Sequence, residues 1–148
     1  MSQRPPERLS DFARRILRRE AESGGHANEM VVGFERACRA LHEGLAPLIS
    51  SSGVHTLLAR ALKLAARDSP LLASASVSFN GDCKLSGLVA TTGTPDSDEV
   101  SDALSAVLAH FMWLLVTFIG ENLGVGKVRE IWPEVPLDSV NPSSGAGK

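Results

Sequence analysis

The feature that most constrains this chain is a run of apolar residues from position 103 to position 119, which reads ALSAVLAHFMWLLVTFI. Only Ser105, His110 and Thr117 interrupt it. Acidic residues crowd positions 96–99 after Pro95, which is typical of a helix start because acidic side chains favour the positive end of a helix. A helix that is apolar on every side has to be buried, either in a protein core or in a membrane.

A single membrane span is one interpretation of residues 103–119, because a span needs about 17–25 apolar residues. Gly120 and Gly124 at its end also have the spacing of a helix-dimer motif. However, His110 lies in the middle of the stretch, and the other helical segments need an apolar partner for their own stripes. We therefore expect a central core helix, with membrane anchoring through 103–119 as the alternative.

Three segments before this run have amphipathic helical periodicity. In residues 7–22 the apolar positions are Leu9, Phe12, Ala13, Ile16 and Leu17. A second helix is predicted over 28–48, where Gly44 and Pro47 should kink or end it, and a third over 54–65 after a restart at 50–53. A short last helix near 125–132 precedes Pro133 and Pro136.

Residues 71–95 are harder to interpret. Val77 and Phe79 alternate with serines, and the turn-forming residues 80–82 separate them from Cys83 and Leu85. A hairpin with this turn pairs Phe79 with Cys83 and Val77 with Leu85. A long loop is the alternative.

These patterns predict an all-α fold: a compact bundle of four to five helices around the central apolar helix, with a possible small β-hairpin near 75–87. We expect one helical domain over 7–133, a flexible N-terminus at 1–6 and a flexible C-terminal tail at 134–148. The predicted core consists of Val31, Phe34, Leu41, Leu57, Leu62, Val107, Phe111, Leu114, Leu115 and Phe118.

The charge of the chain restricts its partners. A net charge of −2 and a pI near 6.1 argue against general affinity for nucleic acid. The charge is uneven, at +3 over residues 1–70 and −5 over 71–148. Cys38 and Cys83 show no C-x-x-C spacing, and the N-terminus has no apolar signal segment, so we expect free thiols in a cytoplasmic protein.

Two sequence motifs of known binding and catalytic sites are matched only in part by this chain. The glycine-rich segment 120–128 lacks a phosphate-loop glycine at 121 and a hydroxyl at 128. His42 and Glu43 begin a zinc-protease motif, but position 46 is Ala instead of His. No catalytic residues, metal ligands or cofactor are therefore predicted, and an enzyme is the weakest functional class, although catalytic groups can converge from distant positions.

Two features remain as candidate sites. His110, inside the apolar helix, is a candidate ligand for a haem-like cofactor, although a histidine in such a helix is more often hydrogen-bonded within the core. An arginine-rich face on the first helix is a candidate interaction surface, although solvation alone accounts for it. Its residues are Arg8, Arg14, Arg15, Arg18 and Arg19.

We therefore expect a non-enzymatic regulatory or protein-protein interaction domain that associates with itself or with a protein partner. Its basis is the surplus of apolar helix surface and the uneven charge. The first alternative is a small-ligand or cofactor sensor with a pocket near His110. The second is a small protein anchored in a membrane.

Overall fold

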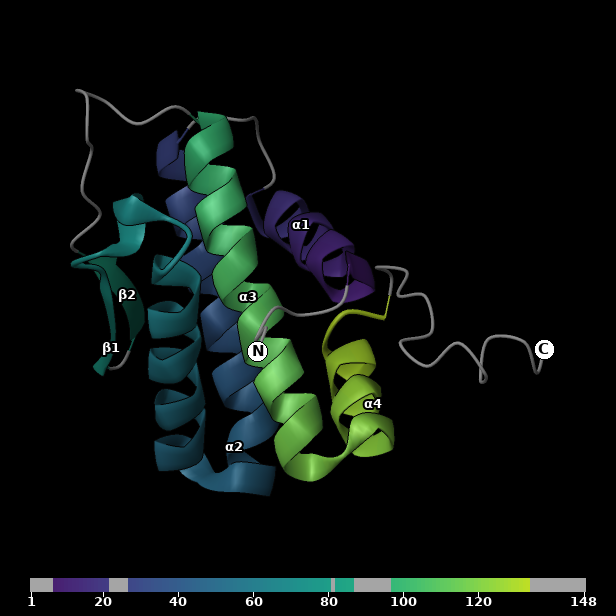
Figure 1. Cartoon of the computed structure of the whole chain (residues 1–148). Coiled ribbons are helices and arrows are strands. Elements are labelled where there is room, and N and C mark those ends of the chain that lie inside the picture. Colours follow the sequence, from purple (N-terminus) through teal and green to yellow (C-terminus); the bar gives the residue numbers. More distant parts are fainter. Residues whose placement is uncertain (1–6, 22–26, 81, 87–96, 134–148) are drawn as a thin grey trace.

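The computed structural model describes residues 7–21, 27–80, 82–86 and 97–133. A central helix, α3 (Ser97–Ile119), is packed against α1 (Glu7–Ala21), α2 (Ala27–Ala66) and α4 (Glu121–Ile131), as Figure 1 shows. A short 3-10 helix, η1 (Pro70–Leu72), leads into two antiparallel strands, β1 (Ser76–Asn80) and β2 (Asp82–Ser86). The predicted helical bundle with a small hairpin is confirmed. The segments predicted to be flexible, 1–6 and 134–148, lie outside the described residues.

The apolar run forms the centre of the bundle. Leu104, Val107, Leu108 and Phe111 in α3 are at most 1% exposed. By length and composition α3 can cross a membrane, and 56% of its most apolar window is buried inside the fold. The core helix of a soluble protein meets the same criteria, and in this fold α3 packs against α1, α2, α4 and η1.

Helix α1 forms from the predicted stripe. Leu9, Phe12, Ala13, Ile16 and Leu17 are all at most 1% exposed, which matches their spacing along one helical face. Burying a leucine, isoleucine or phenylalanine side chain contributes about 1.5–3 kcal/mol to stability. The buried stripe therefore holds α1 against α2 and α3.

Helix α2 contains both helices that were predicted over 28–48 and 54–65. Pro47 lies inside it, and the change of direction comes three residues later at Ser50, where φ is 73° and ψ is 160°. The Gly53 N–H donates to Ser50 Oγ over 3.1 Å, so Ser50 caps the helix that restarts there. We refer to residues 27–49 as the first half of α2 and to residues 51–66 as its second half.

The hairpin has the predicted register. Val77 pairs with Leu85, and Phe79 pairs with Cys83. A two-stranded hairpin is marginal in water and needs support from the rest of the fold. Glu35 in the first half of α2 supplies part of it, because Glu35 Oε2 accepts a hydrogen bond of 2.7 Å from the Leu85 N–H.

Helix α4 turns back along α3. Gly120, with φ of 96°, makes the turn, and the absence of a side chain at Gly124 lets α4 approach Val116 closely. The two glycines that resemble a helix-dimer motif thus serve a contact within the chain. At the end of α4, the indole of Trp132 donates to Glu20 Oε2 over 2.8 Å and joins α4 to α1.

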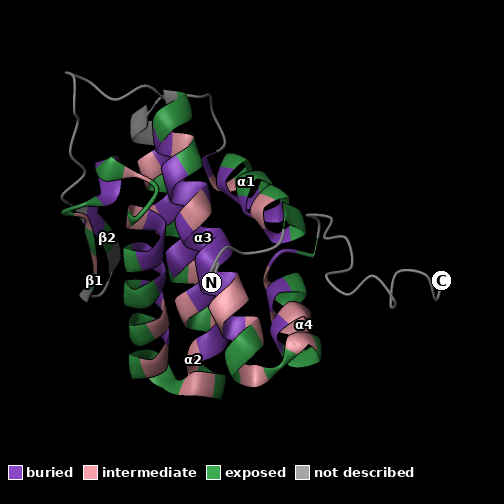
Figure 2. Cartoon of the chain, viewed as in Figure 1, coloured by how far each residue is buried: buried purple, intermediate pink, exposed green. Residues whose placement is uncertain are grey.

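The buried residues lie on the sides of the helices that face one another (Figure 2). Six of the ten predicted core residues are buried: Phe34, Leu41, Leu62, Val107, Phe111 and Leu115. Val31, Leu57 and Leu114 are partly buried and pack against the core. The prediction for Phe118 is wrong, because this side chain is 66% exposed. It lies one residue before the end of α3, where the chain turns through solvent at Gly120.

Candidate functional site

A cavity of about 560 Å³ lies between the second half of α2 and the segment that includes η1 and β1. The α2 wall consists of residues at one helical face: His55, Leu58, Ala59, Leu62, Lys63 and Ala66. The opposite wall consists of Leu72, Ala73, Ala75, Ser76, Val77 and Ser78. The volume falls within the range of about 300–1,000 Å³ that is usual for ligand pockets in proteins.

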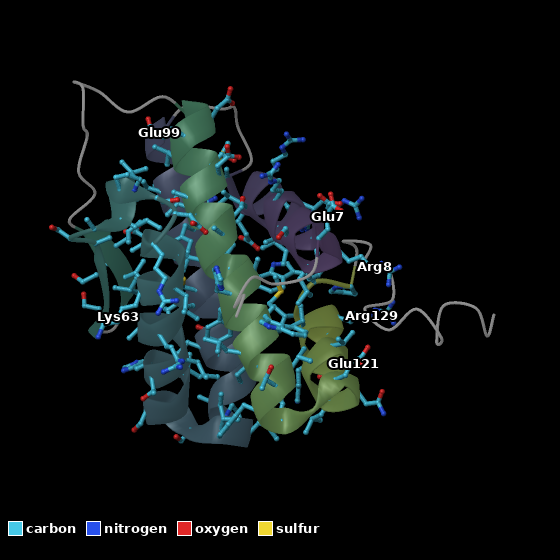
Figure 3. All side chains as sticks on the ribbon, viewed as in Figure 1. Glu7, Arg8, Lys63, Glu99, Glu121 and Arg129 are labelled. Atoms are coloured by element: carbon cyan, nitrogen blue, oxygen red, sulfur yellow. The ribbon has the colours of Figure 1, made fainter. Side chains whose placement is uncertain are left out.

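The floor of this cavity is apolar, and four of its exposed lining residues are polar. Leu58, Leu62 and Leu72 are 6% exposed or less and form the floor. The polar lining residues, including His55 and Lys63, are exposed. Figure 3 shows Lys63 on the side of α2 that faces the hairpin. The cavity thus combines an apolar surface that favours burial of a partner group with polar groups that can orient it.

Local sequence explains how the second wall forms. Pro70 begins η1, and its ring presets the φ that a helical turn requires. The N–H of Ala75 donates to the Leu72 carbonyl over 3.1 Å, which closes a turn before β1 begins. Leu71 and Leu72 are each 1% exposed, so their burial fixes η1 against the bundle and thereby places β1.

The corner of α2 positions His55 at the cavity. Its ring stacks on that of His42, with 5.5 Å between ring centroids and 28° between ring planes. His42 Nε2 is 2.6 Å from the Oγ atom of Ser51, which is the residue that follows the non-helical Ser50. The two histidines therefore join the halves of α2 on either side of the corner.

His110 does not line this cavity. It lies within α3 and is 5% exposed. Its Nδ1 atom and the buried Ser105 hydroxyl make no hydrogen bond to the described residues, although the His110 side chain is engaged in another interaction. Cofactor binding by His110 stays a prediction, and the cavity offers a binding site at a different place in the fold.

The arginine-rich face is exposed along α1. All five of its arginines are exposed, and Figure 3 shows Arg8 projecting from this helix. Arg14 Nη2 lies 3.3 Å from Asp102 Oδ1 of α3, so part of the uneven charge is balanced within the chain. An exposed pair of this kind contributes about 0–1 kcal/mol. The arginines do not line the cavity, and their role in binding stays a prediction.

A metal site in the described part of the chain would need several histidine, cysteine, aspartate or glutamate side chains close together. No group of three or more histidine, cysteine, aspartate or glutamate side chains comes close enough there to hold an ion. The buried Cys38, 1% exposed, lies on the packing face of α2. An inert structural thiol is the ordinary role of a cysteine in such surroundings.

Spacing along the chain does not predict the cavity, because its walls come from two separate segments. No clear signal in the sequence marks a second apolar side of α2, since only Ala59 and Ala66 among residues 55, 59, 63 and 66 are apolar. Helix α2 contacts both α3 and the segment of η1, β1 and β2, which its own sequence pattern does not indicate. Comparison with protein-family models, with curated proteins and with solved structures finds no significant match for this chain.

Proposed function

We propose that this chain is a non-enzymatic protein-interaction domain and that the cavity between α2 and β1 is its binding site. One observation carries the proposal: three buried leucines form the floor of a cavity whose exposed lining residues include four polar ones. Apolar groups entering it would lose water-exposed surface, which favours binding by about 25 cal/mol per Å². A cytoplasmic location remains a prediction from the sequence.

The cavity is tested with the neutral apolar dye N-phenyl-1-naphthylamine and the variant Ala59→Trp. Ala59 lines the α2 wall, so the larger side chain should fill the cavity and reduce dye affinity at least tenfold. Thr56→Trp is the matched control, because Thr56 is exposed on the same helix but does not line the cavity. Equal dye binding by both variants in a fluorescence titration would refute the proposed site.

A second candidate function is self-association through the turn between α3 and α4. Phe118 and Leu123 lie on either side of this turn and are 66% and 45% exposed. Large apolar side chains that are exposed, aromatic ones above all, are typical of protein interfaces. The partner proposed for this surface is a second copy of the chain.

Replacing both Phe118 and Leu123 with serine should weaken self-association at least tenfold, because it removes the apolar surface at the turn. Val32→Ser is the control, since Val32 is 43% exposed on α2, away from the turn. Sedimentation equilibrium over a hundredfold range of protein concentration measures the effect. A parent protein that stays monomeric throughout this range would exclude this candidate.

A further inference from the structure

Strand β1 presents its edge to the cavity. Ser76, Val77 and Ser78 all line the cavity, although successive side chains of a strand point to opposite faces of a sheet. Three consecutive residues can line one cavity when the strand turns its backbone edge toward it. The cavity therefore borders main-chain groups as well as side chains.

The hydrogen bonds of the hairpin show which main-chain groups these are. In an antiparallel pair, opposite residues either exchange two hydrogen bonds or point their N–H and C=O groups outward. Leu85 donates its N–H outward to Glu35, so the pair of Leu85 and Val77 is of the second kind. The N–H and C=O of Val77 thus point away from β2, toward the outer edge of β1.

The two outer edges of the hairpin differ in protection. The edge of β2 is occupied at Leu85 by the Glu35 carboxylate. The edge of β1 joins no further strand in the described residues, and its sequence, SVSFN, has neither charge nor proline. Charges and prolines are the usual means by which edge strands avoid pairing. The edge of β1 is therefore able to accept another extended chain.

The length of the cavity wall and the charge of its lining restrict which extended segment can bind there. The α2 wall runs from residue 55 to residue 66, about 16 Å of helix, which an extended segment of about five residues spans. Lys63 is the only lysine, arginine, aspartate or glutamate among the residues that line the cavity, and it is exposed. A carboxylate on the incoming segment complements this charge.

We propose that the cavity receives an extended peptide of a partner protein, which pairs with β1 as a third strand. The peptide makes two main-chain hydrogen bonds to Val77, packs an aliphatic side chain on the leucine floor and directs a carboxylate toward Lys63. This inference rests on the proposed function of the cavity as a binding site. A small molecule as the natural occupant is the competing outcome.

The probes are three fluorescein-labelled peptides, Gly-Thr-X-Thr-Asp-Thr-Gly-amide, in which X is Val, Ile or Leu. Binding is measured by fluorescence polarisation up to about 1 mM protein, the weak end of specific affinities. We expect saturable binding by at least one of them. Two further peptides carry N-methyl groups, one at positions 3 and 5 and the other at positions 2 and 4. Only one of the two should lose binding, because only alternate N–H groups of a bound strand face β1.

The variant Val77→Pro removes the N–H that faces the cavity without removing a hydrogen bond between β1 and β2, and should weaken peptide binding at least tenfold. Val77→Thr keeps the N–H and the shape of the side chain and should bind within about twofold of the parent. Lys63→Gln should weaken binding of the Asp peptide about two- to fivefold and leave an Asn peptide unaffected.

Three outcomes would overturn the inference: none of the three peptides binds, both N-methylation patterns are tolerated, or Val77→Pro and Val77→Thr bind equally. Dye binding that Ala59→Trp blocks, together with the absence of peptide binding, would keep the cavity as a small-molecule site and reject the added strand. A parent protein that does not bind the dye at all would instead reject the proposed function itself.

Discussion

Replacing Phe111 with alanine is expected to lower the free energy of unfolding by about 3–5 kcal/mol. Phe111 is 0% exposed in the middle of α3, so the change removes a buried ring and leaves a cavity where the surrounding helices meet. Single domains are stable by about 5–15 kcal/mol, so this one substitution takes a large part of the total. Urea unfolding, followed by circular dichroism, measures the change.

Phe118→Ala is the matched control, since it makes the same chemical change one heptad later on the same helix. Because Phe118 is 66% exposed, its replacement should change the free energy of unfolding by about 0.5 kcal/mol or less. The comparison is made at low protein concentration, so that self-association does not contribute. Equal losses from the two substitutions would contradict a core centred on the middle of α3.

Local periodicity predicted most of the fold. The stripe of α1 and the all-round apolar character of α3 each determine which side of a helix is buried, and the structure agrees with both. The alternation around the turn at 80–82 gave the register that pairs Val77 with Leu85. These features depend on residues a few positions apart, where spacing along the chain fixes which side chains share a face.

Features that depend on distant segments were not predictable in this way. Phe118 follows the same periodicity as Phe111, but periodicity cannot indicate where along α3 the neighbouring helices stop covering it. The Trp132 indole bonds to Glu20, which is 112 residues away in the sequence. Such contacts depend on how helices pack, which the spacing along one helix leaves open.

The candidate site shows the same division. His110 was predicted as a candidate cofactor ligand because a polar residue interrupts an apolar run, which is a local feature of the sequence. The cavity needs the second half of α2 and β1 side by side, and the edge of β2 is occupied by Glu35, fifty residues from its partner Leu85. The register of the hairpin was predicted, whereas the element that covers each of its edges was not.

Gly33→Ala is expected to lower the free energy of unfolding by about 1–3 kcal/mol, the usual cost of overpacking. Gly33 lies in α2 against the last residue of α1, and an added Cβ would lie 2.8 Å from the backbone nitrogen of Ala21 and 2.9 Å from its Cα. Backbone atoms cannot rotate away as side-chain ends can, so α1 has to shift, and its buried stripe shifts with it. Urea unfolding again measures the change.

Replacing glycine with alanine also changes helix propensity, and two other helical glycines serve as controls for this effect. Gly126 in α4 has nothing within 4 Å of an added Cβ, so Gly126→Ala should stabilise the protein by about 0.5–1 kcal/mol. At Gly44 the added Cβ would meet Cδ1 of Ile131 at 2.7 Å, the end of a flexible side chain, so the cost should be smaller than at Gly33. We therefore expect the stability order Gly126→Ala, Gly44→Ala, Gly33→Ala, because the cost depends on whether the obstructing atom can move. A Gly33→Ala protein as stable as Gly126→Ala would show that α1 and α2 do not approach as closely as this packing requires.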